Sequence, residues 1–370
     1  MGTDLKATPV AEDDRAHRAA VLRSFGAREA DVDALLAYTE NPFDLSGPLV
    51  LDDEPFVSAW EDYLAASASE GVFSVLQRAL VQLRFPIREG LSETEAYRAA
   101  TRRGDLAALG HDGLFEGGLR LAAPERLRLE LRATPAGRIP VLTAPVREDF
   151  VALVRALSQR NAPAPLPESM GALMVSGYNN WDRVARYRRA WEAEGSGRWA
   201  DAFRALIPQK HRYQDRLILL SEGPYSGVPS ARLGLDDAAW IRTSHAIRRE
   251  HECAHYYCRR ALGAMRTNLH DELIADVYGL VVGAGAYRGD WLRAFFGIGR
   301  PDRSGRLWNY MPGLADPAQT TLSRVLEAAL DAMDDEFDGA EASGLAAQAL
   351  LVRRLAQRGP LAVARVPHFS

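Results

Sequence analysis

The spacing of apolar positions predicts that residues 12–105 are mainly helical. Apolar side chains recur there every three or four positions, which places them on one face of a helix. Residues 127–144 instead alternate between apolar and polar side chains and break at Pro135-Ala136-Gly137, a pattern typical of a β-hairpin. We expect a helix over about residues 146–159 to follow the hairpin.

A proline-rich segment, residues 161–169, is the best candidate for a domain boundary. It carries three prolines in nine residues, a composition that disfavours regular secondary structure. A chain of 370 residues also favours about two domains. We therefore predict an N-terminal, mostly helical region with a β-hairpin over residues 1–165 and a second domain over residues 166–370.

The second half of the chain mixes strand and helix patterns. A short strand is expected at 172–176, a helix over about 181–206 and a strongly apolar strand at 215–223. The rest reads as helical, apart from an irregular stretch at 297–316. The predicted fold class is therefore α+β, mainly helical with a small β-sheet.

Composition and charge narrow the classes of protein and partner. A hydrophobic share of 47% and a charged share of 25% are those of an ordinary globular protein, which argues against disorder or a fibrous repeat. The formal net charge of −4 provides no basic field for a polyanion, so no nucleic-acid partner is expected. Without an apolar run of 18 residues, no membrane partner is expected either.

The N-terminal sequence and the cysteines bear on the compartment. Residues 1–14 contain no apolar stretch of signal-peptide length, so we expect a cytoplasmic protein. Cys253 and Cys258 are five positions apart on one predicted helix and point in different directions, so they cannot form a normal disulfide with each other. We expect both to be small buried side chains.

The candidate chemistry centres on the sequence REHECAHYYCRR. Here His251, Glu252 and His255 form the pattern His-Glu-x-x-His. Residues four apart lie one turn above each other on a helix, so the two imidazoles converge, and neutral imidazole is a preferred zinc ligand. Glu252 is rotated about 100° from His251 on the helix, which suits a general base acting on water at the metal better than a ligand.

The surrounding sequence supports a helix at this motif. Asp236 or Asp237 can cap its start, no proline interrupts it, and Gly263 is a natural C-terminal stop. After a break at Thr267-Asn268 a second helix is expected, with the sequence LHDELIADVYGLVVG.

The second helix offers a third metal ligand. Glu272 and Asp276 lie on one face of it, four positions apart, and Gly279 and Gly283 continue that face. The absence of side chains at the glycines would let the two helices approach closely enough for a carboxylate to reach the metal. A catalytic zinc usually takes three protein ligands, so a carboxylate completes the set.

Together, HECAH and DELIADVYG resemble the gluzincin metallopeptidases, the thermolysin-like and related zinc enzymes. The resemblance covers residues 251–280 and implies a zincin-like catalytic domain whose sheet packs on the metal-binding helix pair. It implies a zinc hydrolase in which a carboxylate activates a zinc-bound water and another orients a ligand imidazole. Its Zn2+ ligands would be His251, His255 and Glu272, the base Glu252, and the orienting carboxylate Asp276.

The sequence departs from that group in three ways. The connection from His255 to Glu272 is slightly short, no Gly-x-Met-Glu-Asn exopeptidase signature occurs, and after His270 only His368 remains as a downstream histidine. The donor to a tetrahedral oxyanion therefore has to come from another side chain. Tyr310 is the first candidate; weaker ones are His270, Tyr287 and Arg260.

Several functions share this ligand set. The first is a metallopeptidase acting on a peptide-like substrate, and the second is a tailoring enzyme acting on a small-molecule amide. The third is a non-haem iron enzyme, because two histidines and one carboxylate also bind Fe2+. A protein that only binds its partner is the fourth.

Two segments before the motif are further candidates for substrate contacts. By analogy with such enzymes, the strand within residues 217–227 would offer an edge along which substrate lies. The run GYNNWD, residues 177–182, could line a pocket, although a helix cap by Asn179 or Asn180 explains it more simply.

Overall fold

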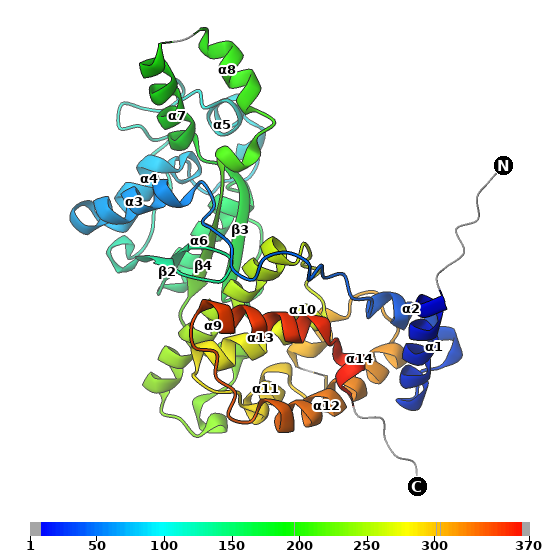
Figure 1. Cartoon of the computed structure of the whole chain (residues 1–370). Coiled ribbons are helices and arrows are strands. Elements are labelled where there is room, and N and C mark those ends of the chain that lie inside the picture. Colours follow the sequence, from blue (N-terminus) through cyan, green and yellow to red (C-terminus); the bar gives the residue numbers. More distant parts are fainter. Residues whose placement is uncertain (1–8, 196, 301, 304, 365–370) are drawn as a thin grey trace, which may run out of the picture. The chain divides into compact units, whose positions relative to one another are not determined.

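The computed structural model describes residues 9–195, 197–300, 302–303 and 305–364 (Figure 1). It divides the chain into two compact units. Residues 50–223 form the middle unit, and residues 1–49 with 224–370 form the terminal unit. The predicted division at residue 165 is therefore wrong, because the proline-rich segment connects a helix and a strand of the same unit.

The middle unit is built around a four-stranded mixed sheet in the order β1-β2-β4-β3. β1 and β2 form the predicted antiparallel hairpin, β2 runs parallel to β4, and β3 is antiparallel to β4. The strands span Arg128–Arg132 (β1), Ile139–Ala144 (β2), Ala172–Asn179 (β3) and Gln214–Ser221 (β4). β4 is an interior strand with both edges paired, which contradicts the expected substrate-binding edge at this strand.

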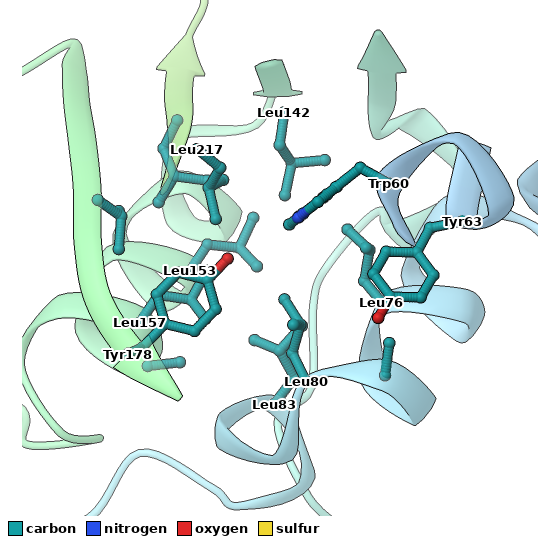
Figure 2. Close-up of a cluster of buried hydrophobic side chains, with 14 of the residues drawn as sticks. Trp60, Tyr63, Leu76, Leu80, Leu83, Leu142, Leu153, Leu157, Tyr178 and Leu217 are labelled. Atoms are coloured by element: carbon teal, nitrogen blue, oxygen red, sulfur yellow. The ribbon is translucent and has the colours of Figure 1, made fainter. Parts of the chain in front are cut away.

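Helices α3 (Val57–Glu70), α4 (Val72–Ala79) and α6 (Arg147–Ser158) share one apolar core with the sheet. Figure 2 shows side chains of these helices, such as Trp60, turned towards residues of the strands, such as Leu142. Burying this much apolar surface is the main stabilising contribution to the middle unit.

A buried polar group lies beside this core. The carboxylate of Asp215 accepts hydrogen bonds from Trp60 Nε1 at 2.9 Å, Asn180 Nδ2 at 2.7 Å and Arg183 Nη1 at 2.6 Å. Burial is the largest effect on this carboxylate and raises the pKa of Asp215, while the charge of Arg183 and the three hydrogen bonds oppose the shift. Asn180 also caps α7 (Trp181–Glu194), which agrees with the simpler interpretation of the GYNNWD run.

The terminal unit contains the two helices of the candidate site. α9 (Asp237–Ala261) begins where the Asp236 side chain accepts a hydrogen bond from Ala239 N at 2.7 Å. α10 (Leu269–Tyr278) is capped by Asn268 and continues into a π-helical turn, Gly279–Gly283 (η8). The predicted cap, stop and break of this helix pair are confirmed.

The other elements complete the two units. In the terminal unit they are α1 (Pro9–Ser24), α2 (Glu29–Tyr38), η6 (Tyr225–Gly227), η7 (Ser230–Leu233), α11 (Gly289–Phe296), η9 (Arg306–Tyr310), α12 (Asp316–Phe337), α13 (Leu345–Gln357) and α14 (Pro360–Val363). In the middle unit they are η1 (Val81–Arg84), η2 (Leu91–Glu93), α5 (Glu95–Arg98), η3 (Ala99–Arg103), η4 (Pro124–Arg126), α8 (Trp199–Leu206) and η5 (Lys210–Arg212).

The structure confirms the mainly helical α+β class with a small sheet. Two details differ from the prediction. The sheet takes β1 and β2 from the first half of the chain and belongs to the middle unit, whereas the helix pair belongs to the terminal unit. The helix expected at 181–206 is also divided into α7 and α8, because Gly195 takes a left-handed conformation at φ 75°.

No helix in the described part of the chain combines the length and the apolar character that a membrane span requires. The prediction drawn from residues 1–14 lies partly outside the described residues, since the description begins at residue 9.

Candidate metal centre

α9 presents the two histidines of the motif from one face, one turn apart. Both side chains are buried. Their rings meet nearly edge to face at an interplanar angle of 83°, and His251 Nε2 lies 3.0 Å from His255 Nε2. The i, i+4 spacing on one helix is what brings the two nitrogens together.

α10 supplies the carboxylate. Glu272 is buried, and its two oxygens lie 3.5 Å from His251 Nε2 and 3.5 Å from His255 Nε2. One ligand atom from each residue thus converges on the same small volume. The structure therefore brings the three predicted ligands together.

The close approach of α10 to α9 depends on two glycines, as the sequence predicted. A Cβ atom on Gly279 would lie 2.9 Å from the carbonyl oxygen of Ile247. A Cβ atom on Gly283 would lie 2.8 Å from the carbonyl carbon and oxygen of Ala246. Both distances are shorter than a normal contact with backbone, so any larger residue would push the helices apart.

Asp276 holds the ring of His251 from the side away from Glu272. Its Oδ1 atom lies 2.9 Å from His251 Nδ1, as the proposed orienting role requires. Burial opposes ionisation of Asp276, but the charge of Arg306 and the contact with His251 outweigh it and hold its pKa well below the usual range. A permanently ionised acceptor favours the tautomer with hydrogen on Nδ1 and a free electron pair on Nε2.

Two further residues, Tyr225 and Arg306, complete this support and were not predicted. The Tyr225 hydroxyl lies 2.8 Å from His251 Nδ1 and donates to Asp276 Oδ1 at 2.6 Å. Arg306 forms an ion pair with Asp276 Oδ2 and donates to the Tyr225 hydroxyl at 3.2 Å. Both come from short 3-10 elements that have no recognisable signature in the sequence.

In the absence of a metal, His255 and Glu272 form a buried pair of opposite charges. Burial disfavours the charged form of the His255 ring, but its hydrogen bond and charge interaction with Glu272 prevail and raise its pKa to about 9. Burial likewise opposes ionisation of Glu272, yet His255 lowers its pKa to about 2. Near neutral pH, His255 therefore carries a proton that Glu272 stabilises.

The same atoms fit a metal ion. Zinc binds imidazole nitrogen and carboxylate oxygen at about 2.0–2.2 Å, which requires ligand atoms about 3–3.5 Å apart in a tetrahedral site. The observed separations of 3.0 and 3.5 Å lie in this range. Among the described residues, buried His255 Nδ1 has no hydrogen-bond partner, so a ligand on Nε2 would be the main polar restraint on that ring.

Residues 20–359 match the model of a family of unknown function, DUF7005. The chain belongs to this family. No curated protein and no solved structure matches the chain.

The two predicted catalytic residues, Glu252 and Tyr310, both lie near the three converging side chains. Glu252 is half-buried on α9, and its charge helps to raise the pKa of His255; no residue of the described chain hydrogen-bonds its carboxylate. The Tyr310 hydroxyl lies close to Glu272, and their interaction contributes to the raised pKa of Tyr310. Burial and the nearby Glu272 and Asp276 charges hold the pKa of Tyr310 well above its usual value, so it remains a donor.

The weaker oxyanion candidates are engaged elsewhere in this DUF7005 member. His270 is buried, with Nε2 at 3.0 Å from Leu355 O, and the Tyr287 hydroxyl donates to Asp334 at 3.1 Å. The Arg260 guanidinium lies over the ring of Tyr256. Cys253 and Cys258 are both buried and unlinked, as expected.

Gly283→Ala tests the helix approach. The added methyl would meet the backbone of Ala246, so we expect a loss of about 1–3 kcal/mol in unfolding free energy and a weaker zinc affinity. Chemical denaturation and zinc titration measure the two effects. Gly47→Ala is the matched control, since its Cβ would lie at an ordinary 3.5 Å from Ala261 O. Wild-type values for Gly283→Ala would contradict the packing argument.

Zinc binding should release about one proton at pH 6.5. His255 is protonated below its pKa of about 9 in the metal-free protein, whereas a ligand imidazole must be neutral. Apparent affinity should therefore rise about tenfold per pH unit through the neutral range and level off once pH exceeds that pKa. Calorimetry in buffers of different ionisation enthalpy counts the protons. An affinity independent of pH between 6 and 8 would refute this.

Proposed function

We propose that this protein is a zinc-dependent hydrolase that cleaves an amide or peptide bond. The observation that carries the proposal is the convergence of His251, His255 and Glu272, with ligand atoms 3.0 and 3.5 Å apart. Next to His251 on α9 is a carboxylate, Glu252, that no described residue hydrogen-bonds. A metal site that served only to hold the fold would be expected to have four protein ligands rather than three.

A bound zinc ion would supply a Lewis acid that polarises a carbonyl and lowers the pKa of water to about 7. The proposed role of Glu252 is to take the proton from the attacking water and deliver it to the leaving nitrogen. Its position next to His251 and its lack of a described hydrogen-bond partner support that role, because the carboxylate is available to exchange a proton.

Tyr310 is proposed as the donor to the oxyanion that forms when water adds to the carbonyl. Its hydroxyl reaches Glu272, which is one of the three converging ligands, so it borders the reacting volume. Its raised pKa keeps the proton on the hydroxyl at neutral pH, as a hydrogen-bond donor requires. Arg306 packs over the Tyr310 ring at 5.5 Å and helps to fix it.

The proposed substrates are peptide-like molecules or small-molecule amides. Metal analysis of protein purified without added metal, followed by turnover of a peptide library and of a panel of small amides, tests the proposal. Zinc at about one ion per chain with amide hydrolysis supports it. Iron with oxygen-dependent turnover would overturn it, since the same donor types form a non-haem iron site.

Glu252→Gln should abolish hydrolysis while leaving the metal in place. Removal of a general base costs about 10²–10⁴-fold in rate, and Gln keeps the shape of Glu without its basicity. The measurements are kcat and bound zinc for the same preparation. Glu327→Gln, an exposed position on α12, is the matched control and should behave as wild type. Full activity of Glu252→Gln would refute the mechanism.

Tyr310→Phe should lower kcat by about 10²–10³-fold with little change in KM. The expected loss is that of one oxyanion donor, which acts mainly in the transition state. Zinc content should stay at the wild-type level, because Tyr310 is not one of the three converging side chains. A rise in KM with kcat unchanged would show instead that Tyr310 only binds the substrate.

A further inference from the structure

A second candidate site lies entirely within the middle unit. It is a cavity of about 480 Å³, within the size range of small-molecule sites. Its walls come from α4, η1, α7, α8, the end of η3 and the segment after it. Part of the GYNNWD run contributes, because Trp181 and Asp182 line it.

One wall is aromatic. The rings of Trp181 and Phe203 lie 6.1 Å apart, and those of Phe203 and Trp199 lie 5.7 Å apart. Trp181 is fixed at its edge, since its Nε1 donates to Thr101 O at 2.8 Å. One side of its ring covers Gly104, where a Cβ atom would come within 2.4 Å of it. A fixed row of rings provides surface on which a planar ligand can stack.

The second feature of the cavity is a concentration of positive charge. Among the described residues, four arginines and one acid, Asp182, line the cavity. The lining arginines are Arg78, Arg84, Arg103 and Arg188. Three of them pair with exposed or half-exposed glutamates at the surface, contacts that contribute little and can yield to a ligand.

Arg84 differs from the other three. Its guanidinium is partly buried and donates to the carbonyl oxygens of Gln77 and Arg78. No carboxylate of the described residues lies within ion-pair distance of it. Burial lowers the pKa of Arg84; the charge of Asp182 opposes this shift, and the charge of Arg78 adds to it. An anion in the cavity would supply the missing charge.

We propose that this cavity binds an aromatic ring that carries a phosphate, a ligand of the nucleoside monophosphate class. The ring stacks on the row formed by Trp181, Phe203 and Trp199, and the phosphate pairs with Arg84 and Arg78. The site is independent of the metal centre, which belongs to the terminal unit.

The test is calorimetric titration of the full chain with AMP, adenosine and inorganic phosphate, with and without a chelator. AMP should bind more tightly than either part, and equally well after chelation. Arg84→Gln should weaken AMP binding by at least about tenfold, because charged hydrogen bonds to the phosphate are lost. The affinity for adenosine, which has no phosphate, should stay the same. Arg189→Gln, an exposed position on α7 outside the cavity, is the matched control.

Phe203→Leu provides a second variant, should Arg84→Gln fail to fold. It should weaken the binding of both AMP and adenosine by at least about fivefold, because base stacking is lost. The affinity for inorganic phosphate should stay the same. Three results would overturn the proposal: AMP binding no tighter than phosphate, AMP affinity unchanged by the variants that fold, or AMP binding that disappears with the chelator.

Discussion

The close packing of α10 against α9 is the constraint on which the candidate centre depends. A carboxylate side chain is short, so Glu272 can reach both imidazoles only if the helices approach almost to backbone contact. Gly279 and Gly283 make that approach possible because they have no Cβ atom. A Cβ atom at these positions would lie only 2.9 and 2.8 Å from the backbone of α9. The π-helical turn that contains both glycines lies at this contact.

Electrostatics then determine the state of the ligands. Without a metal, two buried imidazoles and a buried carboxylate would be costly to hold together unless a proton neutralises part of the charge. The raised pKa of His255 and the lowered pKa of Glu272 correspond to such a proton, held on His255 beside an ionised Glu272. A divalent cation would replace the proton and satisfy all three donors at once. The proposed metal ion would take the place of this proton.

The group behind His251 adds orientation. A hydrogen-bonded network behind this ring consists of Asp276, Tyr225 and Arg306. Its hydrogen bonds fix the orientation of the donor and acceptor groups around His251 Nδ1. Arg306 balances the charge of Asp276, so the carboxylate can stay ionised away from water. The same arginine lies over the Tyr310 ring. One side chain thus links the support of His251 with the proposed oxyanion donor.

Local sequence signals explain what could be predicted. The caps at Asp236 and Asn268, the hairpin and the i, i+4 pairs all depend on residues near one another in the chain, and the structure contains them. The unit division and the interior position of β4 depend on pairings between distant segments, which no local pattern encodes. Tyr225 and Arg306 were missed for the same reason: their partners lie 51 and 30 positions away from them.

Anomalous scattering at the zinc edge, from crystals of the protein as purified, tests the central claim most directly. The account predicts one peak in the terminal unit, bounded by His251 Nε2, His255 Nε2 and the Glu272 carboxylate. A structure of the native protein that shows no peak there, or in which the three side chains turn apart, would contradict it.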